Sequence, residues 1–291
     1  MNAMRPWVMG VGLFFFLSAF AHESAGQDRP PIIDMHQHTT GWGSDHTVQS
    51  TLAVMDELNI VTAFLSGPLE EVYEWTATAP DRFIPSPQFH LPGGDGFPDI
   101  EKLKIEYLAG RLHGMGEINV QYLGIPPNAP RLVPYFALVE ELDLPVLIHC
   151  EGIGAPYPTF RSSAGHPLLL EEVLVRHPKL RIYLENAGYP FLHEMIALMF
   201  QYPQVHADLS TITRLIPREA FHDYVRALVR AGYGKRLMFG TDSPSRKVAQ
   251  TVEAIESASF LTDEQKRDIF YNNAARFLRL SDEQIATHHN R

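Results

Sequence analysis

Cysteine is almost absent from this chain, and clusters of basic residues are missing. Cys150 is the one cysteine among 291 residues, so an internal disulfide cannot form and the core must stabilise the fold. Lysine and arginine number 24 against 34 aspartates and glutamates, which gives a formal net charge of −10. An acidic chain of this kind argues against nucleic acid and anionic membranes as partners.

Several catalytic motifs are missing as well. The sequence has no Gly-x-Ser-x-Gly elbow, which disfavours a serine hydrolase, and no loop of the kind that binds nucleotide phosphates. Gly152-Ile153-Gly154 is a fragment of a dinucleotide-binding fingerprint without the third glycine. The chemistry must therefore come from other residues.

A long apolar run is present near the beginning of the chain. Arg5 precedes apolar residues 7–20, and Ala19-Phe20-Ala21 has the small-x-small pattern of a cleavage site. We predict a signal peptide over residues 1–21 and a polar linker over 22–30, because an uncleaved anchor would need a longer run of about 20 apolar residues. The expected protein is exported, to the periplasm, and is free of the membrane after cleavage.

Short apolar runs then alternate with longer segments of helical spacing. The predicted strands cover residues 32–36, 60–66, 83–88, 114–120, 145–149, 181–185, 205–209 and 237–240. Predicted helices between them include residues 48–58, 131–142, 168–176, 191–200 and 220–231. Eight such alternations are typical of an α/β fold of the (β/α)8 TIM type, which we expect over 31–281. An open doubly wound sheet is the alternative, and 282–291 is predicted as a flexible tail.

Metal-binding residue types follow the predicted strands. His36 and His38 end the first strand, and alternation should place both on one face together with Asp34. His149 ends "LPVLIHC" and Asp242 follows "RLMFGTD". A barrel brings the carboxyl ends of its strands to one mouth, and three imidazoles with a carboxylate suit zinc or a similar ion. Taken singly, His149 could be a core histidine and Asp242 a helix N-cap.

These motifs resemble a known family. "IDMHQH", His149, "ENAGYP" and "FGTDSP" are similar to the amidohydrolase superfamily, in the amidohydrolase-related branch of aminocarboxymuconate-semialdehyde-decarboxylase-like proteins, over about residues 32–280. The resemblance implies a small-molecule substrate and one divalent ion. That ion would be zinc, with manganese or iron as alternatives, and would be surrounded by His36, His38, His149 and Asp242.

Two further positions bear on the metal site. Glu117 in "GMGEI" resembles a glutamate that contacts metal in related deoxyribonuclease-like barrels; its alternative is a buried carboxylate held by an arginine. The family usually has a histidine where this chain has Asn186. Asparagine can hydrogen-bond a substrate or water, but it is a poor ligand beside imidazole and takes up no proton near neutral pH. A second metal is therefore not expected.

Three functions follow from these residues. The first is hydrolysis, in which metal-bound water with a pKa lowered towards ~7 attacks an ester, lactone or amide carbon while Asp242 takes the proton. The second is metal-dependent decarboxylation, for which Arg161 could anchor a carboxylate unless it forms a surface salt bridge. The third is a non-catalytic binding protein, suggested by Asn186. The sequence leaves homo-oligomer formation open.

Overall fold

The computed structural model describes residues 29–39, 46–89, 97–242 and 247–291. The predicted signal peptide and most of the predicted linker lie outside these residues. Within the described residues, no helix combines the length and the apolar character needed to cross a membrane.

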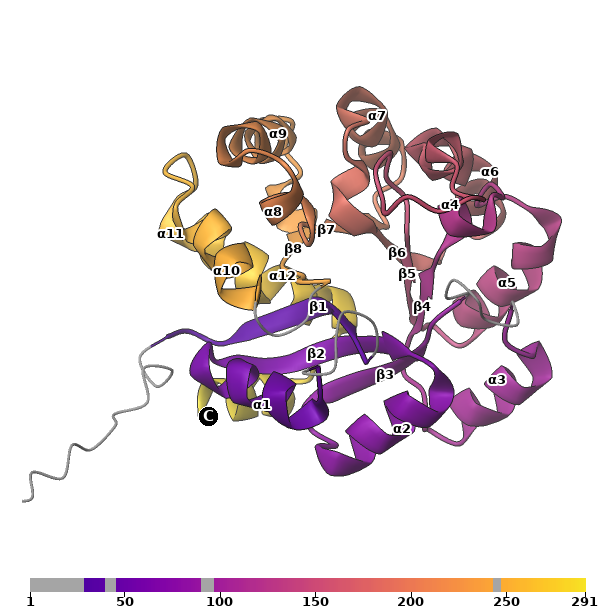
Figure 1. The fold of residues 1–291 in the computed structure, drawn as a ribbon, viewed down its shortest axis with the longest axis horizontal. Coiled ribbons are helices and arrows are strands. Elements are labelled where there is room, and N and C mark those ends of the chain that lie inside the picture. Colours follow the sequence, from indigo (N-terminus) through magenta and orange to yellow (C-terminus); the bar gives the residue numbers. More distant parts are fainter. Residues whose placement is uncertain (1–28, 40–45, 90–96, 243–246) are drawn as a thin grey trace, which may run out of the picture.

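Parallel strands form the centre of the molecule (Figure 1). In the described residues they are β1 (Ile32–His38), β2 (Ile60–Gly67), β3 (Phe83–Pro87), β4 (Met115–Ile118), β5 (Pro145–Ile148), β6 (Arg181–Leu184), β7 (Val205–Asp208) and β8 (Leu237–Met238). Each lies within a few residues of a predicted strand, and the predicted (β/α)8 barrel is confirmed. Neighbouring strands pair in parallel in the orders β1-β2-β3 and β4-β5-β6-β7-β8.

Two backbone contacts join these sets of strands into a ring. Phe89, just beyond β3, donates its N–H to the carbonyl of Glu117 in β4 at 2.8 Å. At the other seam, the Met35 N–H of β1 donates to the Phe239 carbonyl that follows β8, at 2.9 Å. The strands therefore end around one common mouth.

Helices cover the outer side of the ring in Figure 1. They are α1 (Val48–Glu57), α2 (Leu69–Thr78), α3 (Ile100–Leu108), α4 (Val120–Leu123), α5 (Val133–Glu141), α6 (Glu171–Arg176), α7 (Leu192–Gln201), α8 (Ile212–Leu215), α9 (Arg218–Arg230), α10 (Val248–Glu256), α11 (Asp263–Arg267), α12 (Asn273–Leu278) and α13 (Asp282–His289). The sequence of α9 shows why they pack this way: Phe221, Tyr224, Val225 and Leu228 recur at helical spacing and are buried.

Side chains fill the interior of the barrel away from its mouth. The Tyr183 ring meets Phe64 edge to face, with ring centroids 5.6 Å apart, and its hydroxyl donates to the Met35 carbonyl at 2.7 Å. Phe277 of α12 packs on the same tyrosine at 5.4 Å. The C-terminal segment therefore packs against this interior cluster. The polar residues of the barrel lie at the other end, where the strands reach their carboxyl ends.

The last residues form a helix where the sequence predicted a tail. Ser281 accepts a hydrogen bond from the Gln284 N–H at 3.2 Å, and the two residues form a capping box at the start of α13. At the other end of α13, His288 Nδ1 lies 3.0 Å from the Tyr271 hydroxyl. Capping and this side-chain contact account for the helix.

Candidate metal site

A register shift in β1 arranges the first two histidines. The pairing of β1 with β2 is irregular between Asp34 and Gln37, so simple alternation of faces does not hold there. The Asp34 carboxylate accepts from the backbone N–H of His36 at 3.0 Å and from the Thr241 hydroxyl at 2.6 Å. Asp34 therefore joins β1 to the segment after β8 through backbone and hydroxyl donors.

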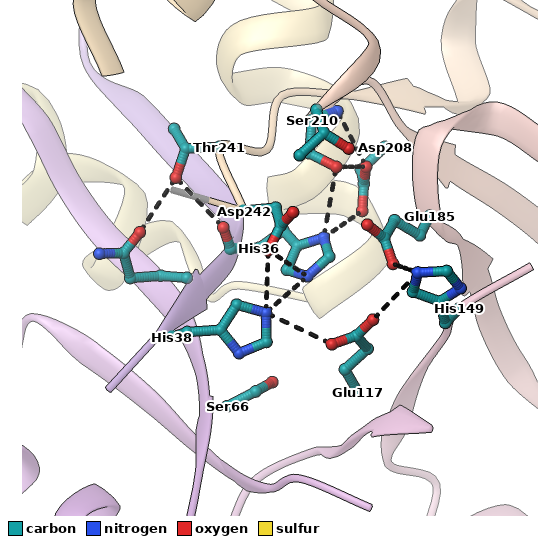
Figure 2. A network of polar contacts seen from close by, with 12 residues as sticks. His36, His38, Ser66, Glu117, His149, Glu185, Asp208, Ser210, Thr241 and Asp242 are labelled. Atoms are coloured by element: carbon teal, nitrogen blue, oxygen red, sulfur yellow. Dashed lines mark hydrogen bonds and ion pairs between the residues drawn. The ribbon is translucent and has the colours of Figure 1, made fainter. Parts of the chain in front are cut away.

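His36, His38 and Asp242 converge at the mouth of the barrel (Figure 2). The Nε2 atoms of the two histidines are 3.1 Å apart. Asp242 Oδ1 lies 3.1 Å from His38 Nε2 and 3.7 Å from His36 Nε2. The N-cap of α10 is Lys247, so Asp242 does not cap that helix. Imidazole nitrogens and a carboxylate oxygen that face one point are the ligand atoms that first-row divalent ions prefer.

Hydrogen bonds on the far side of two rings leave their Nε2 atoms facing the cluster. His36 Nδ1 donates to Asp208 Oδ2 at 3.2 Å, from the end of β7. His149 Nδ1 donates to Gln121 Oε1 at 2.8 Å. An N–H on Nδ1 leaves a lone pair on Nε2, and such partners are usual behind metal-binding histidines. Asp208 was missed from the sequence, although it ends a predicted strand region.

Glu117 lies between His149 and the pair formed by His36 and His38. Its Oε2 is 3.4 Å from His38 Nε2, and its Oε1 is 3.9 Å from His149 Nε2. The amides of Gln88 and Asn119 both donate to Oε2 at 3.2 Å. The described partners of this carboxylate are thus histidines, amides and the Glu185 carboxyl, and the arginine of the alternative interpretation is not among them.

Two glutamates that the sequence analysis missed complete the surroundings of His149. Glu151 Oε1 lies 3.3 Å from His149 Nε2, and Glu185 Oε2 lies 3.5 Å from the same atom. Both carboxylates are buried. Glu185 directly follows β6, and Glu151 comes just after His149. The rule that selected His149 and Asp242, polar residues at the carboxyl ends of strands, would have found them.

Asn186 is fully buried behind these glutamates. Its Nδ2 donates to Glu151 Oε2 at 2.8 Å and to Glu185 Oε1 at 3.2 Å. Its Oδ1 accepts from the Ile212 N–H at 2.9 Å. The backbone φ of 51° at Asn186 lies in the left-handed region, which asparagine tolerates better than most residues. The amide is therefore bonded within the protein on both its donor and its acceptor side.

Arg161 and Arg214 differ in what they contact. Arg161, the predicted carboxylate anchor, is exposed, and its guanidinium donates to the carbonyls of Pro158 and Phe160 at 3.3 and 2.9 Å. Arg214 of α8 lies 4.0 Å from Asp242 Oδ2 and donates to the Asp242 carbonyl at 2.7 Å. Sequence reasoning missed Arg214, because a helix residue between two strands gives no signal of its own.

The electrostatics of the cluster favour a bound cation. Burial alone would lower the pKa of His36, but the charges of Asp208, Asp242 and Glu117 overcome it and raise this pKa to about 10. For the two glutamates, burial acts in the other direction and raises the pKa of the Glu151 and Glu185 carboxyls well above their usual range. Ligand atoms of His36, His38 and Glu117 lie within 4.8 Å of one another, and so do those of Glu117, His149 and Glu185. Buried carboxylates outnumber the imidazoles here, so the residues present fit a divalent metal ion.

The fold and this cluster define a TIM-barrel protein with a buried group of imidazoles and carboxylates at the carboxyl ends of its strands. The model of the Amidohydro_2 family, described as amidohydrolase, matches residues 33–280. The chain belongs to this family, and the resemblance recognised from its motifs is confirmed.

Solved structures share the fold at low sequence identity. A probable 2-pyrone-4,6-dicarboxylic acid hydrolase from Acinetobacter baumannii, with citric acid bound, is 17% identical, with 86% of this chain and 99% of that chain covered and a TM-score of 0.62. The 5-carboxyvanillate decarboxylase from Sphingomonas paucimobilis is 16% identical, with 86% and 99% covered and a TM-score of 0.61. An amidohydrolase from Burkholderia multivorans with bound zinc is 14% identical, with 86% and 100% covered and a TM-score of 0.61. A search of curated proteins found no match.

Proposed function

We propose that this protein is a metal-dependent hydrolase that acts on an ester, lactone or amide carbon of a small molecule. The observation that carries the proposal is the convergence of His36 Nε2, His38 Nε2 and Asp242 Oδ1, within 3.1 to 3.7 Å of one another, at the mouth of the barrel. Membership of the amidohydrolase family supports it.

His36, His38, His149 and Asp242 would hold the ion, with Glu117 beside them. Zinc is our first choice because three imidazoles and a carboxylate suit it and because the Burkholderia multivorans relative has zinc bound; manganese and iron are the alternatives. When bound, such an ion supplies a Lewis acid that acidifies water and polarises a carbonyl oxygen.

Asp242 is the residue we propose as the proton acceptor. Burial would raise the pKa of its carboxyl, but the charges of His36 and His38 outweigh burial and lower this pKa to about 2. The carboxylate is then ionised at neutral pH and can take the proton of the attacking water. Arg214 donates to the Asp242 carbonyl and, at 2.8 Å, to the Thr241 carbonyl, so it positions the backbone that carries this carboxylate.

The charges around the cluster favour hydrolysis of an uncharged substrate over decarboxylation. A decarboxylase has to bring the substrate's carboxylate to the reacting centre, and the carboxylates of Glu117 and Asp242, whose pKa values are lowered by the nearby histidines, would repel it. Arg161, the expected anchor, contacts carbonyls of its own loop. Decarboxylation stays the second candidate because a structural neighbour is the 5-carboxyvanillate decarboxylase.

The experiment is a substrate panel with the metal-loaded protein. Uncharged esters, lactones and amides are incubated beside aromatic carboxylates, and the products are analysed for the hydrolysed bond and for carbon dioxide. Release of carbon dioxide without hydrolysis would replace our proposal by the second candidate. Turnover no greater than that of free metal would point to a non-catalytic binding protein.

Asp242→Asn tests the proton acceptor in the same assay. At equal metal occupancy we expect turnover to fall about 100-fold or more, because general base catalysis contributes about that much. Asp223→Asn on the exposed face of α9 is the matched control and should leave turnover unchanged. Unchanged turnover in Asp242→Asn would remove Asp242 from this role.

Export is a separate proposal that rests on residues 1–21 of the sequence. Expression of the full chain in a Gram-negative host, followed by N-terminal sequencing of the periplasmic fraction, should find a protein that begins at His22. An intact N-terminus in the cytoplasm would contradict it.

A further inference from the structure

A cavity of about 260 Å³ lies at the other end of β1 from the metal site. Its walls come from residues 29–32 at the start of β1, from the end of α10, from the helix that begins with α11 and from His289 of α13. β1 starts on the left of Figure 1 and runs from Ile32 to His38, and at about 3.3 Å per residue it spans roughly 20 Å. The cavity and the metal site are therefore separate.

One wall of the cavity contains a π-helical turn. The chain forms this turn over Asp268–Asn272, between α11 and α12. Phe270 and Tyr271 of the turn line the cavity, and Lys266 and Arg267, which precede it on the same helix, line the cavity as well. A π-helical turn is rare in proteins, and such turns often occur at functional sites. The turn therefore marks this wall as a candidate for ligand binding.

The side chains of the turn give the cavity an apolar wall. The Tyr271 ring is buried, and its hydroxyl has a partner in His288 Nδ1 at 3.0 Å. The Phe270 ring packs on Phe239, with ring centroids 5.4 Å apart. Ile32, at the start of β1, is buried and lines the same cavity. These side chains are held by contacts within the protein, so the apolar surface is formed before any ligand binds.

Basic side chains outnumber acidic ones around the cavity. Arg29, Lys266 and Arg267 line it, and the acidic residues that line it are Glu256 and Asp263. Arg29 pairs with the Glu256 carboxylate, and Lys266 Nζ donates to the Glu256 backbone carbonyl at 2.6 Å. In the part of the chain that the structure describes, no carboxylate forms an ion pair with Lys266 or Arg267. A local excess of positive charge on a chain of net charge −10 favours a negatively charged ligand.

We propose that this cavity binds a small organic carboxylate with an apolar body. The body packs against Ile32, Phe270 and Tyr271, and the carboxylate accepts hydrogen bonds from Lys266 and Arg267. A guanidinium can bind a carboxylate through two N–H groups, and no described residue occupies those of Arg267. The volume is small for a ligand site, so the body is no larger than about one ring with a short chain. The inference is independent of the proposed function, because it involves neither the metal nor the reaction.

The test follows the binding of 3-(4-fluorophenyl)propionate by fluorine NMR. The protein is first stripped with a chelator, which is then removed by dialysis, so that the carboxylate of the probe cannot bind a metal ion at the other site. We expect a saturable change of the fluorine signal with a dissociation constant of about 1 mM or lower. The corresponding amide has the same body without the charge and should bind about 10-fold more weakly.

Three variants test the two ends of the site. Arg267→Gln and Lys266→Gln should each weaken binding of the carboxylate about 10-fold and change binding of the amide by less than about 2-fold, because only the charged group loses a partner. Phe270→Leu should weaken both probes about 3-fold, because a contact between rings is lost. Arg230→Gln, at the exposed end of α9, is the matched control and should bind both probes as the wild type does.

Thermal unfolding without the probe separates loss of binding from loss of the fold. Arg267 is exposed, so Arg267→Gln should unfold at the same temperature as the wild type. A wild type that binds neither probe would overturn the site. Equal affinity for the carboxylate and the amide, or wild-type affinity for the carboxylate in both glutamine variants, would also overturn it, because the basic residues would then not select the ligand.

Discussion

One hydrogen bond to each ring decides which nitrogen of His36 and of His149 faces the cluster. Asp208 holds His36 Nδ1, and Gln121 holds His149 Nδ1. Asp208 is itself held, because its Oδ1 accepts from the Ser210 hydroxyl at 2.7 Å and from the Asn186 N–H at 3.2 Å. The ring orientation of His36 therefore depends on a carboxylate that does not face the proposed ion.

Asp208→Asn should weaken metal binding without removing a ligand. Asparagine can keep the donors at Oδ1, but its NH2 group would then face His36 Nδ1 and favour the tautomer that carries the proton on Nε2. We expect the metal dissociation constant to rise about 10- to 100-fold. The measurement is competition with a chromogenic chelator.

Ser210→Ala is the control for this substitution. The serine hydroxyl contacts Asp208 and lies 3.4 Å from His36 Nδ1, but the aspartate can hold the ring without it. Metal affinity should change by a few-fold at most. Wild-type affinity in Asp208→Asn would show that the imidazole is oriented by other contacts.

The sequence predicted the strands, and the residues at their carboxyl ends, better than any other part of this protein. All predicted strands were found, since each is a short apolar run bounded by turn or helix-ending residues. His36, His38 and Asp242 were predicted from strand ends and converge. Asp34 was placed on the wrong face, because the register shift beside it leaves no mark in the pattern of apolar residues.

The carboxylates around His149 were missed for a different reason. Glu151 and Glu185 both stand at strand ends, so the rule that selected His149 and Asp242 would have found them had it been applied to glutamates as well; what the sequence does not show is that both meet one imidazole. The role of Asn186 was also out of reach. Its partners come from separate strand ends, so no local pattern links them.

The contact between β7 and α12 gives a prediction for the effect of pH on stability. His206 of β7 packs on Phe277 of α12 with ring centroids 4.7 Å apart. Burial, with help from Arg236 and Arg276, lowers the pKa of His206 from 6.5 to about 4. The unfolded chain therefore binds this proton more readily, and stability should fall as the pH drops from about 6.5 to about 4, by at most about 3 kcal/mol.

His206→Gln should remove this part of the acid sensitivity. Urea unfolding of the chelator-treated proteins at pH 7 and at about pH 4.5 should show the variant losing about 2 kcal/mol less than the wild type. His193→Gln, on the exposed surface of α7, is the control and should follow the wild type. Equal losses in wild type and His206→Gln would show that the buried imidazole is not what titrates.

The molecule as a whole separates its stabilising core from its polar site. The interior cluster around Tyr183 packs against the C-terminal helices, and the charged residues gather at the strand ends. That arrangement leaves carboxylates close together in a buried space, where protons or a cation have to relieve their mutual repulsion. Metal should therefore affect the stability of the entire fold as well as the site.

Removing metal should lower the thermal unfolding midpoint of the whole domain. An ion that binds the native state alone, at a free concentration about 100 times its dissociation constant, stabilises that state by about 2.7 kcal/mol. For a domain of this size the midpoint should then fall by about 5 to 10 °C in chelator, measured by calorimetry. The His36→Ala/His38→Ala variant should show a smaller shift between chelator and metal, because part of the binding free energy is gone. A midpoint that chelator leaves unchanged would mean that no ion is coupled to the folding of this barrel, and the carboxylates at its mouth would then have to be neutralised by protons.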